Sequence, residues 1–301
     1  EGCDVCIQHT LPHLYSYDSR YKNIAFLAVE SSHFKDTGWQ HNINLMDELW
    51  VPSNAAKASC ENSGVNIPIK VAPHSLDISK YQKENGGNKI EEMLPTFNFA
   101  FIGEFIERKN LQALIRAFHL EFDFQEPVNL LIKTSKVELP QIQDYIKHVK
   151  SGLKIRSRYR EEIIIAGRLE EKDYVSVLGQ CHSFVMPSRG EAFCIPALEA
   201  MSLGVPVIHT ANTGMDDFCI GASVESSSVP CLGAVSTISN LDTARSDWQE
   251  INIKKLCSAM REAYQKWNSQ ESQEDSEKVK VHASGYDHAN VGKQLKELLN
   301  D

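Results

Sequence analysis

The chain has 301 residues, of which 42% are hydrophobic and 24% charged, a composition typical of a globular protein with about two domains. Its 31 basic and 40 acidic residues give a net charge of −9, which disfavours nucleic acid as a partner because phosphates repel such a chain. The sequence contains no run of about 18 apolar residues, so it predicts no transmembrane segment, although it leaves peripheral membrane contact open.

Four short apolar runs in the first 80 residues each end in polar residues, and we interpret them as strands. The runs lie at 5–7, 24–29, 49–51 and 69–71. Ser53 and Gly64 are typical of the two ends of a helix, which predicts a helix over 54–63. Apolar runs that alternate with helices indicate a parallel sheet, and such sheets bind ligands at the carboxyl ends of their strands.

A polar, glycine-rich segment at 81–96 is predicted to link two domains. Beyond it, alternating strands and helices predict a second doubly wound sheet over 97–284. We expect strands at 97–102, 128–133, 163–166, 183–186 and 206–209, and helices at 110–122, 141–150, 172–178 and 196–203. We expect the charged stretch 269–278 to be an exposed helix end or loop. An amphipathic helix at 290–299, within a C-terminal segment 285–301, is expected to pack back toward the N-terminal domain, residues 1–80.

The segment 186–206 carries most of the chemical information. Pro196 suits the first turn of a helix, and Gly204 suits its end. The unpaired N–H groups at the start of that helix, together with its dipole, predict an anion site at the mouth of the sheet. Glu191 in the turn and Glu199 in the helix flank this site, and each carboxylate can accept two hydroxyl hydrogen bonds from a sugar. Alternatively, Glu199 only offsets the helix dipole and Glu191 is a solvated turn residue.

A second informative element follows the strand at 97–102. Gly103 permits a sharp turn, and Arg108 and Lys109 come just before the next helix. Cations oppose the dipole at a helix N-terminus, so an anionic ligand would explain their position. The alternative is a pair of exposed basic residues.

These residues together resemble the signature of retaining glycosyltransferases of family 4. The resemblance rests on the two glutamates eight positions apart, the Gly-Val-Pro that follows them, and Gly103 with Arg108-Lys109-Asn110. Segments 46–53 and 73–77 resemble the family's strand into the acceptor-side cleft and its crossover to the donor domain. The resemblance covers nearly the whole chain and implies an α/β protein with two Rossmann-like parallel-sheet domains, the GT-B fold, the first domain being incomplete.

The resemblance implies that a nucleoside-diphosphate sugar binds mostly to the second domain. Lys109 and Arg108 would neutralise the diphosphate. Glu191 would hold the donor sugar, and Glu199 would hold the ribose. In the first domain, Glu30 would face the acceptor hydroxyl.

Further cleft residues follow from the same resemblance. The expected donor-side contacts are Gly103, the backbone N–H groups of Phe193, Cys194 and Ile195, and the region of Arg168 and Leu169 near the base. From their positions in the chain, His9 is expected to line the cleft or to be solvated, and His74 at the crossover is expected in the cleft, where it would touch the diphosphate.

Three features depart from the family pattern. Glu104 stands where many members have arginine, and Ala192-Phe193-Cys194 stands where the family has Gly-Phe-Gly. Without these two glycines the loop backbone approaches a phosphate less freely, unless both replacing residues keep φ below zero. Only about 80 residues precede the predicted linker, so we expect the opening part of the first domain to be missing, either because the chain is longer than this sequence or because the domain is short.

The predicted reaction transfers a sugar from the donor to the hydroxyl of a carbohydrate, lipid-linked or other acceptor, with retention. The leaving diphosphate would be stabilised electrostatically, so we expect no cofactor and no metal, and no Asp-x-Asp occurs. Eight cysteines at scattered spacing favour a reducing compartment, and we expect a cytoplasmic protein. Two alternatives stay open: an inactive sugar-nucleotide-binding or assembly module, and a sugar-nucleotide epimerase of GT-B type.

Overall fold

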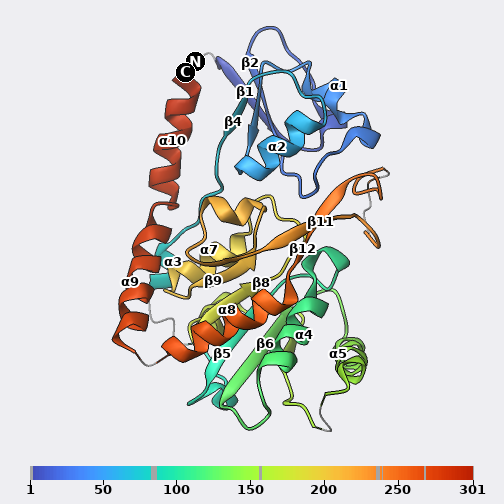
Figure 1. Ribbon diagram of the computed structural model, residues 1–301. Coiled ribbons are helices and arrows are strands. Elements are labelled where there is room, and N and C mark those ends of the chain that lie inside the picture. The colour runs from blue at the N-terminus through green and yellow to red at the C-terminus, as the bar shows by residue number, and fades with distance from the viewer. Residues whose placement is uncertain are drawn as a thin grey trace.

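The fold contains two parallel sheets, one above the other in Figure 1. A computed structural model describes residues 3–82, 87–155, 158–234, 238, 240–267 and 269–300. The N-terminal sheet has four strands in the order β1-β2-β3-β4, all parallel. They are β1 (Val5–His9), β2 (Lys22–Phe26), β3 (Glu48–Val51) and β4 (Ile69–Val71). The C-terminal sheet has six, and the two together confirm the predicted α/β class.

The N-terminal sheet packs against two helices, α1 (Trp39–Ile43) and α2 (Asn54–Asn62). The Ser53 hydroxyl accepts a hydrogen bond from the N–H of Ala56 at 3.2 Å, so the predicted N-cap of α2 is present. Gly64 has φ +87, the left-handed conformation that glycine adopts readily after a helix. The five-residue helix α1 is not predicted by the sequence pattern, because it spans little more than one turn.

The C-terminal sheet has the strand order β10-β9-β8-β5-β6-β7 and is parallel throughout. Its strands are β5 (Phe97–Ile102), β6 (Val128–Thr134), β7 (Ile163–Ala166), β8 (Ser183–Met186), β9 (Val207–Thr210) and β10 (Gly221–Val224). The order reverses between β5 and β8. Loops that leave these two strands diverge around a crevice, the usual place for a ligand in such a sheet. The sheet therefore brings together the segments after 102 and after 186.

The six-stranded sheet packs against α4 (Leu111–Glu121), α5 (Leu139–Leu153), α6 (Glu171–Leu178), α7 (Ile195–Ser202) and α8 (Ile253–Lys266). Helix α7 begins one residue earlier than predicted, so Pro196 is its second residue. Helix α4 begins at Leu111 because Asn110 has φ +52, outside helical geometry. Helix α5 is longer than predicted, and a capping box between Glu138 and Gln141 starts it.

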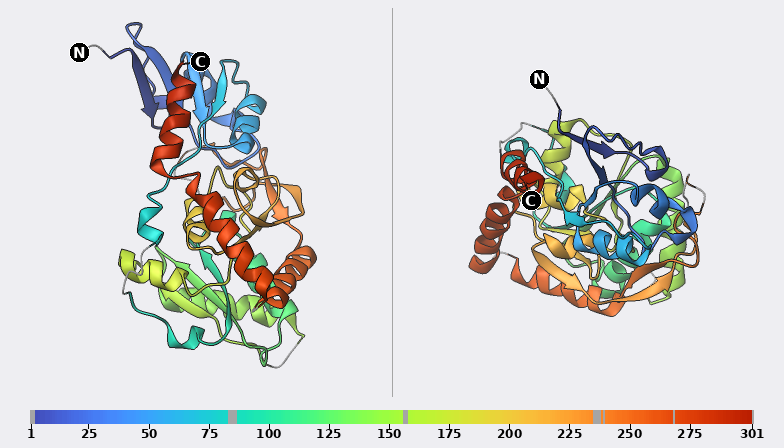
Figure 2. Two further views of the ribbon diagram at one scale, coloured as in Figure 1. Left: turned by 90° about the vertical axis from the view of Figure 1, so that its left-hand side faces the viewer. Right: turned by 90° about the horizontal axis from the view of Figure 1, so that it is seen from above.

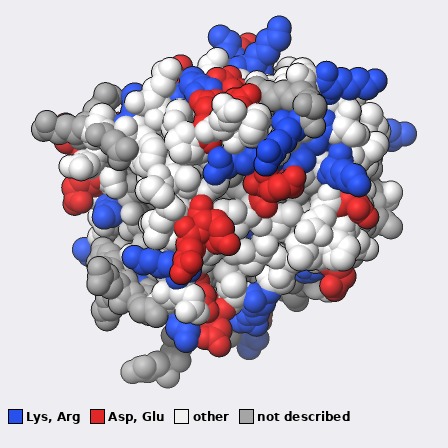
Figure 3. All heavy atoms as spheres, turned by 90° about the horizontal axis from the view of Figure 1, so that it is seen from below, with Lys and Arg blue, Asp and Glu red and all other residues white. Residues whose placement is uncertain are grey.

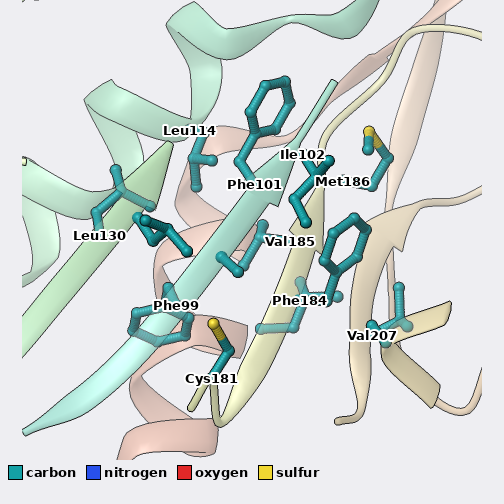
Figure 4. Close-up of a cluster of buried hydrophobic side chains, with 14 of the residues drawn as sticks. Phe99, Phe101, Ile102, Leu114, Leu130, Cys181, Phe184, Val185, Met186 and Val207 are labelled. Carbon is teal, nitrogen blue, oxygen red and sulfur yellow. The ribbon is translucent and has the colours of Figure 1, made fainter. Parts of the chain in front are cut away.

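The larger hydrophobic core lies around the central strands of the six-stranded sheet (Figure 4). Phe99 and Phe101 on β5, and Phe184 on β8, are fully buried there. Leu114 of α4 packs on the same cluster. At roughly 1.5–3 kcal/mol for each buried side chain of this size, these residues hold the reversal point of the sheet rigidly.

An antiparallel hairpin, β11 (Ser226–Pro230) and β12 (Asp247–Ile251), extends from the C-terminal half to the N-terminal one. The N–H of Ser32 donates to the Asp247 carbonyl at 2.9 Å, and the N–H of Asp247 donates back to the Ser32 hydroxyl at 2.8 Å. The Thr243 hydroxyl donates to Asp36 at 2.7 Å. No sequence signal predicts this hairpin, because its strands are polar and do not alternate with apolar residues.

The C-terminal helices run along one side of the molecule (Figures 1 and 2). They are α9 (Gln270–Ser284) and α10 (His288–Asn300), so the stretch 269–278 lies mainly in a continuous helix and is not a loop. The Lys70 ammonium donates to the Leu298 carbonyl at 2.9 Å, and Leu295, Leu298 and Leu299 pack near Trp50 of β3. Helix α3 (Ser79–Gln82) lies at the start of the predicted linker, whose residues 83–86 are outside the described residues.

The surface carries charges of both signs. On the face shown in Figure 3, Lys and Arg side chains lie among Asp and Glu side chains. Among the described residues, no helix is both long enough and apolar enough to cross a bilayer.

Candidate active site

The candidate site forms where the loops after β5 and β8 meet. The N–H of Arg189 donates to the Arg108 carbonyl at 2.7 Å, and the Ser188 hydroxyl donates to the same carbonyl at 3.1 Å. Gly103 follows β5, and a Cβ added there would lie 3.1 Å from the ring of Phe101. The two loops are therefore fastened together at the carboxyl ends of neighbouring strands.

Four residues predicted to be catalytic lie in one ionic cluster, which we call the cation cluster: Glu30, Arg108, Lys109 and Glu191. The Lys109 ammonium is 2.5 Å from Glu191 Oε1, and Arg108 Nη1 is 3.3 Å from the same oxygen. Arg108 Nη2 also lies 3.1 Å from Glu30 Oε1 in the N-terminal half. The Glu191 side chain is only 5% exposed, so it depends on these partners for its charge.

The pKa values in the cluster follow from burial and from the opposite charges. Burial alone would raise the pKa of Glu191, but Lys109 and Arg108 more than offset it, so its pKa lies below the ordinary value. Burial raises the pKa of Glu30, and the nearby Glu191 adds to this against the opposing effect of Arg108. Glu191 therefore keeps its charge most readily, and Glu30 is the carboxylate that protonates first.

The start of α7 lies beside the cation cluster. Within the described part of the chain, no hydrogen bond is donated by the backbone N–H groups of Phe193, Cys194 or Ile195. Cys194 has φ +92, so one of the two residues that replace the family's glycines adopts the left-handed conformation, whereas Ala192 does not. The predicted donors are therefore free, but Cys194 holds its backbone at a steric cost.

Glu199 has different partners from Glu191. The Tyr81 hydroxyl donates to Glu199 Oε1 at 2.7 Å, and the Tyr174 hydroxyl donates to Oε2. Burial, followed by the charge of Glu199, raises the pKa of both tyrosines, so both stay neutral. The sequence does not predict either tyrosine as a site residue, because neither lies in a motif; Tyr174 is only recognisable as part of a helix.

The other predicted residues take no part in the ion pairs of the cation cluster. Arg168 and Leu169 follow β7, the edge strand of the larger sheet, and none of the cluster's ion pairs involves them. His9 and His74 lie near each other with ring centroids 6.4 Å apart. The rings of His74 and Phe193 are perpendicular to each other with centroids 5.4 Å apart, so His74 reaches the start of α7. Burial and then His9 lower the pKa of His74, which favours a neutral imidazole.

A cavity of 390 Å³, which we call the acidic cavity, lies between the two halves of the molecule. Its walls come from the loop after β2, helix α2, the loop at 189–191, the loop at 212–217 and strand β12. Glu191 and Glu30 line it, and Lys109 does not. Gly190 is required here, because an added Cβ would lie 1.9 Å from the Glu30 carbonyl oxygen. Among the described residues, no three His, Cys, Asp or Glu side chains are grouped to hold a metal ion.

Comparison with known proteins identifies the domain that carries most of this site. Residues 87–222 match the family described as glycosyl transferases group 1. The match runs from the segment before β5 into β10 and covers just under half of the chain. The match confirms the resemblance stated from the two glutamates and the Arg-Lys pair.

Individual relatives support the same assignment. The chain is 30% identical over 116 residues to the serotype-specific mannosyltransferase WbdA of Escherichia coli, covering 36% of this chain and 13% of WbdA. It is 30% identical over 126 residues to the uncharacterized glycosyltransferase MJ1178 of Methanocaldococcus jannaschii, covering 41% of this chain and 32% of that protein. The chain thus matches only 13% and 32% of the lengths of these two curated glycosyltransferases.

A solved structure is similar over almost the whole chain. The crystal structure of Anabaena Alr3699/HepE in complex with UDP matches with a TM-score of 0.62 and 16% identity, covering 93% of this chain and 72% of that one. At this identity the likeness concerns the fold. It confirms the GT-B arrangement of two parallel-sheet domains.

Proposed function

We propose that this protein moves a sugar from a nucleoside-diphosphate sugar to an acceptor hydroxyl, with retention at the anomeric carbon. One observation carries the proposal: Lys109 and Arg108 meet Glu191 beside the start of α7. Cations, unpaired N–H groups and a buried carboxylate suit the diphosphate and the sugar hydroxyls of such a donor. The names of the relatives agree, since HepE was crystallised with UDP and UDP-glucose and WbdA is a mannosyltransferase.

The cation cluster would act on the leaving group. As the bond between sugar and diphosphate breaks, negative charge grows on the phosphate oxygens, and Lys109, Arg108 and the dipole of α7 stabilise it. When Lys109 also binds the diphosphate, the ion pair between Lys109 and Glu191 weakens. The Glu191 oxygens then accept hydrogen bonds from the donor sugar. Because these cations neutralise the diphosphate, we propose that transfer needs no metal.

The remaining predicted roles extend this picture. Glu199, held by its two tyrosines, keeps lone pairs for the ribose hydroxyls. The backbone at Arg168 and Leu169 would lie near the base. Glu30 and the segment 1–80 would form the acceptor side, with 97–284 as the donor side.

The test combines binding and turnover. Thermal unfolding is measured with UDP-, GDP- and ADP-sugars, and the nucleoside diphosphate released in the presence of candidate acceptors is quantified. One class of donor should raise the free energy of unfolding by about 2.7 kcal/mol when the donor concentration is a hundred times its dissociation constant. Lys109→Met and Glu191→Gln should abolish turnover. Lys136→Met should not, because that lysine is 78% exposed and pairs with Glu104.

One observation favours a second candidate, a non-catalytic sugar-nucleotide-binding module. Cys194 occupies a left-handed position where the family has glycine, which limits close approach of the phosphate. This candidate predicts that a nucleotide sugar binds and that neither transfer nor hydrolysis follows. If no nucleotide sugar shifts the unfolding temperature, both candidates are wrong. Nuclear magnetic resonance of the product determines whether the anomeric configuration is retained.

A further inference from the structure

A second cavity, which we call the basic cavity, lies at the end of the C-terminal sheet that points away from the N-terminal half (Figure 1). Its volume is 840 Å³, and its wall includes Asn129 near the start of β6 and Ile163 at the start of β7. The cation cluster lies at the carboxyl ends of the strands, and β6 alone spans seven residues, or roughly 20 Å. The basic cavity is therefore separate from the proposed donor site.

The described part of the cavity wall carries charged side chains of both signs, namely Lys150, Arg158, Arg160, Glu92, Glu161 and Glu162. The Lys150 ammonium pairs with Glu162 at 2.9 Å and with Glu161 at 3.3 Å. Glu162 is only 1% exposed, and its other carboxylate oxygen is held by His119. The charge of Lys150 is therefore satisfied within the protein, which leaves the two arginines as the cations that a ligand can use.

Neither arginine of the basic cavity has a carboxylate partner among the described residues. The Arg160 guanidinium donates from Nε to Asn129 Oδ1 at 3.0 Å and from Nη1 to the Glu126 carbonyl at 2.8 Å, so neutral acceptors hold it in place. Its Nη2 group donates to no described residue. Arg158 is exposed, and its guanidinium carbon lies 5.1 Å from the centroid of the Phe124 ring. Both arginines therefore keep N–H donors for a ligand.

Two other arginines in the described chain also lie over aromatic rings, but their charges are paired. Arg261 pairs with Glu121 at 2.6 Å, and Arg20 pairs with Asp18 at 2.6 Å. Arg158 differs from both, although the chain has 40 acidic residues and a net charge of −9. Two arginines without a carboxylate partner on one cavity wall indicate that the missing anion is a ligand.

We propose that the basic cavity binds a phosphate monoester, with Arg158 and Arg160 as the residues that hold the phosphate. At neutral pH this group carries close to two negative charges, and its three terminal oxygens accept hydrogen bonds. A guanidinium presents paired N–H donors that fit two such oxygens at once. The exposed carboxylate of Glu92, which has no ion pair among the described residues, disfavours a second phosphate and suits a hydroxyl of the esterified group.

A soluble metabolite and a lipid headgroup both present a phosphate monoester, so the experiment tests the two sources separately. Glycerol 3-phosphate is titrated into the protein, and its Kd is measured by phosphorus nuclear magnetic resonance, with glycerol as the uncharged counterpart followed by proton resonance. Cosedimentation with phosphatidylcholine vesicles, with and without phosphatidic acid, tests the lipid source. At least one of the two phosphate monoesters should bind, and neither glycerol nor pure phosphatidylcholine should.

Variants of Arg158 place this binding in the basic cavity. Arg158→Gln removes an exposed side chain that makes no hydrogen bond within the described residues, so the fold should be unchanged and the phosphate should bind about tenfold or more weakly. Arg158→Lys keeps the charge without the paired donors and should lose less affinity. Arg20→Gln is the matched control, because it removes the same charge from an arginine that is 74% exposed and lies over Tyr21.

The cation cluster can also attract a phosphate, so the titrations are repeated in Lys109→Met/Glu191→Gln. Binding that depends on Arg158 should persist in this double variant. Complete loss of phosphate binding there would assign the phosphate to the donor site and overturn the inference, although the proposed function would stand. Failure of both monoesters to bind, equal binding of glycerol, or equal weakening by Arg158→Gln and Arg20→Gln would also overturn it. Arg158-dependent binding of phosphatidic acid alone would identify the lipid headgroup as the source, and binding of glycerol 3-phosphate alone would identify a soluble metabolite.

Discussion

The two carboxylates of the motif are Glu191, in the turn before α7, and Glu199, within α7, and their partners are of opposite kinds. Glu191 is held by the cations Lys109 and Arg108, whereas Glu199 is held by the neutral hydroxyls of Tyr81 and Tyr174. A buried ion pair changes when another anion competes for its cation. A carboxylate that accepts hydrogen bonds from neutral hydroxyls keeps these partners when an anionic ligand binds nearby. We therefore expect the Glu191 end to respond to the diphosphate and the Glu199 end to act as a fixed support.

The largest change in the free energy of unfolding should follow from removing a cation that pairs with Glu191. Lys109→Met leaves the buried Glu191 with only Arg108, and breaking a buried pair in this way costs about 3–5 kcal/mol of unfolding free energy. The double variant Lys109→Met/Glu191→Gln should recover most of that loss, because no unpaired charge remains. Urea unfolding of the single and double variants measures the coupling. Additive effects would show that the two side chains do not depend on each other.

The same ion pair predicts a pH dependence. The lowered pKa of Glu191 contributes stability that is present above its unfolded value, about 4.3, and lost as the pH falls through the folded value. The stability difference between the unchanged protein and Glu191→Gln should therefore shrink as the pH falls below about 4. In Lys109→Met the pKa of Glu191 rises, so the stability that the ionised Glu191 contributes should begin to be lost at a higher pH.

A smaller effect is expected from the glycine that places Glu191 against the N-terminal half. In Gly190→Ala the new Cβ meets the Glu30 carbonyl oxygen at 1.9 Å, so one backbone segment must move, and we expect a loss of about 2–3 kcal/mol. Gly152→Ala is the control, because Gly152 lies in α5 with nothing within 4 Å of an added Cβ. It should stabilise the protein by about 0.5–1 kcal/mol. Equal effects at the two sites would contradict the close approach to Glu30.

The Glu199 end should give a still smaller effect. Tyr174→Phe removes one hydrogen bond to the carboxylate and should cost about 1.5 kcal/mol, with the other bond from Tyr81 retained. Nucleotide affinity should change less than in Glu199→Gln, since the carboxylate itself remains. Tyr17→Phe should have no effect, because Tyr17 is 50% exposed. If the free energy of unfolding of Tyr174→Phe depended on pH in the same way as that of Lys109→Met, the contrast between Glu191 and Glu199 would be wrong.

The same contrast shows what the sequence could predict. The parallel sheets follow from apolar runs between turn residues, and their topology brings Lys109 to Glu191 across 82 positions of sequence. Tyr81 and Tyr174 were not predicted, because their contact with Glu199 depends on how α3 and α6 pack against α7. The acidic cavity was not predicted for a similar reason, since part of its wall comes from a polar hairpin without an alternating pattern.

The smallest predicted effect concerns the departure from the family at the start of α7. Because Cys194 has φ +92, Cys194→Gly should be more stable than Cys194→Ala by about 1 kcal/mol. Two positions earlier, where φ is not positive, Ala192→Gly should instead destabilise the protein by about 0.5–1 kcal/mol. The glycine at 194 also lets the backbone approach a phosphate, so Cys194→Gly should bind the nucleoside diphosphate more tightly. Unchanged affinity would mean that the cations, and not the loop backbone, limit how closely the diphosphate approaches.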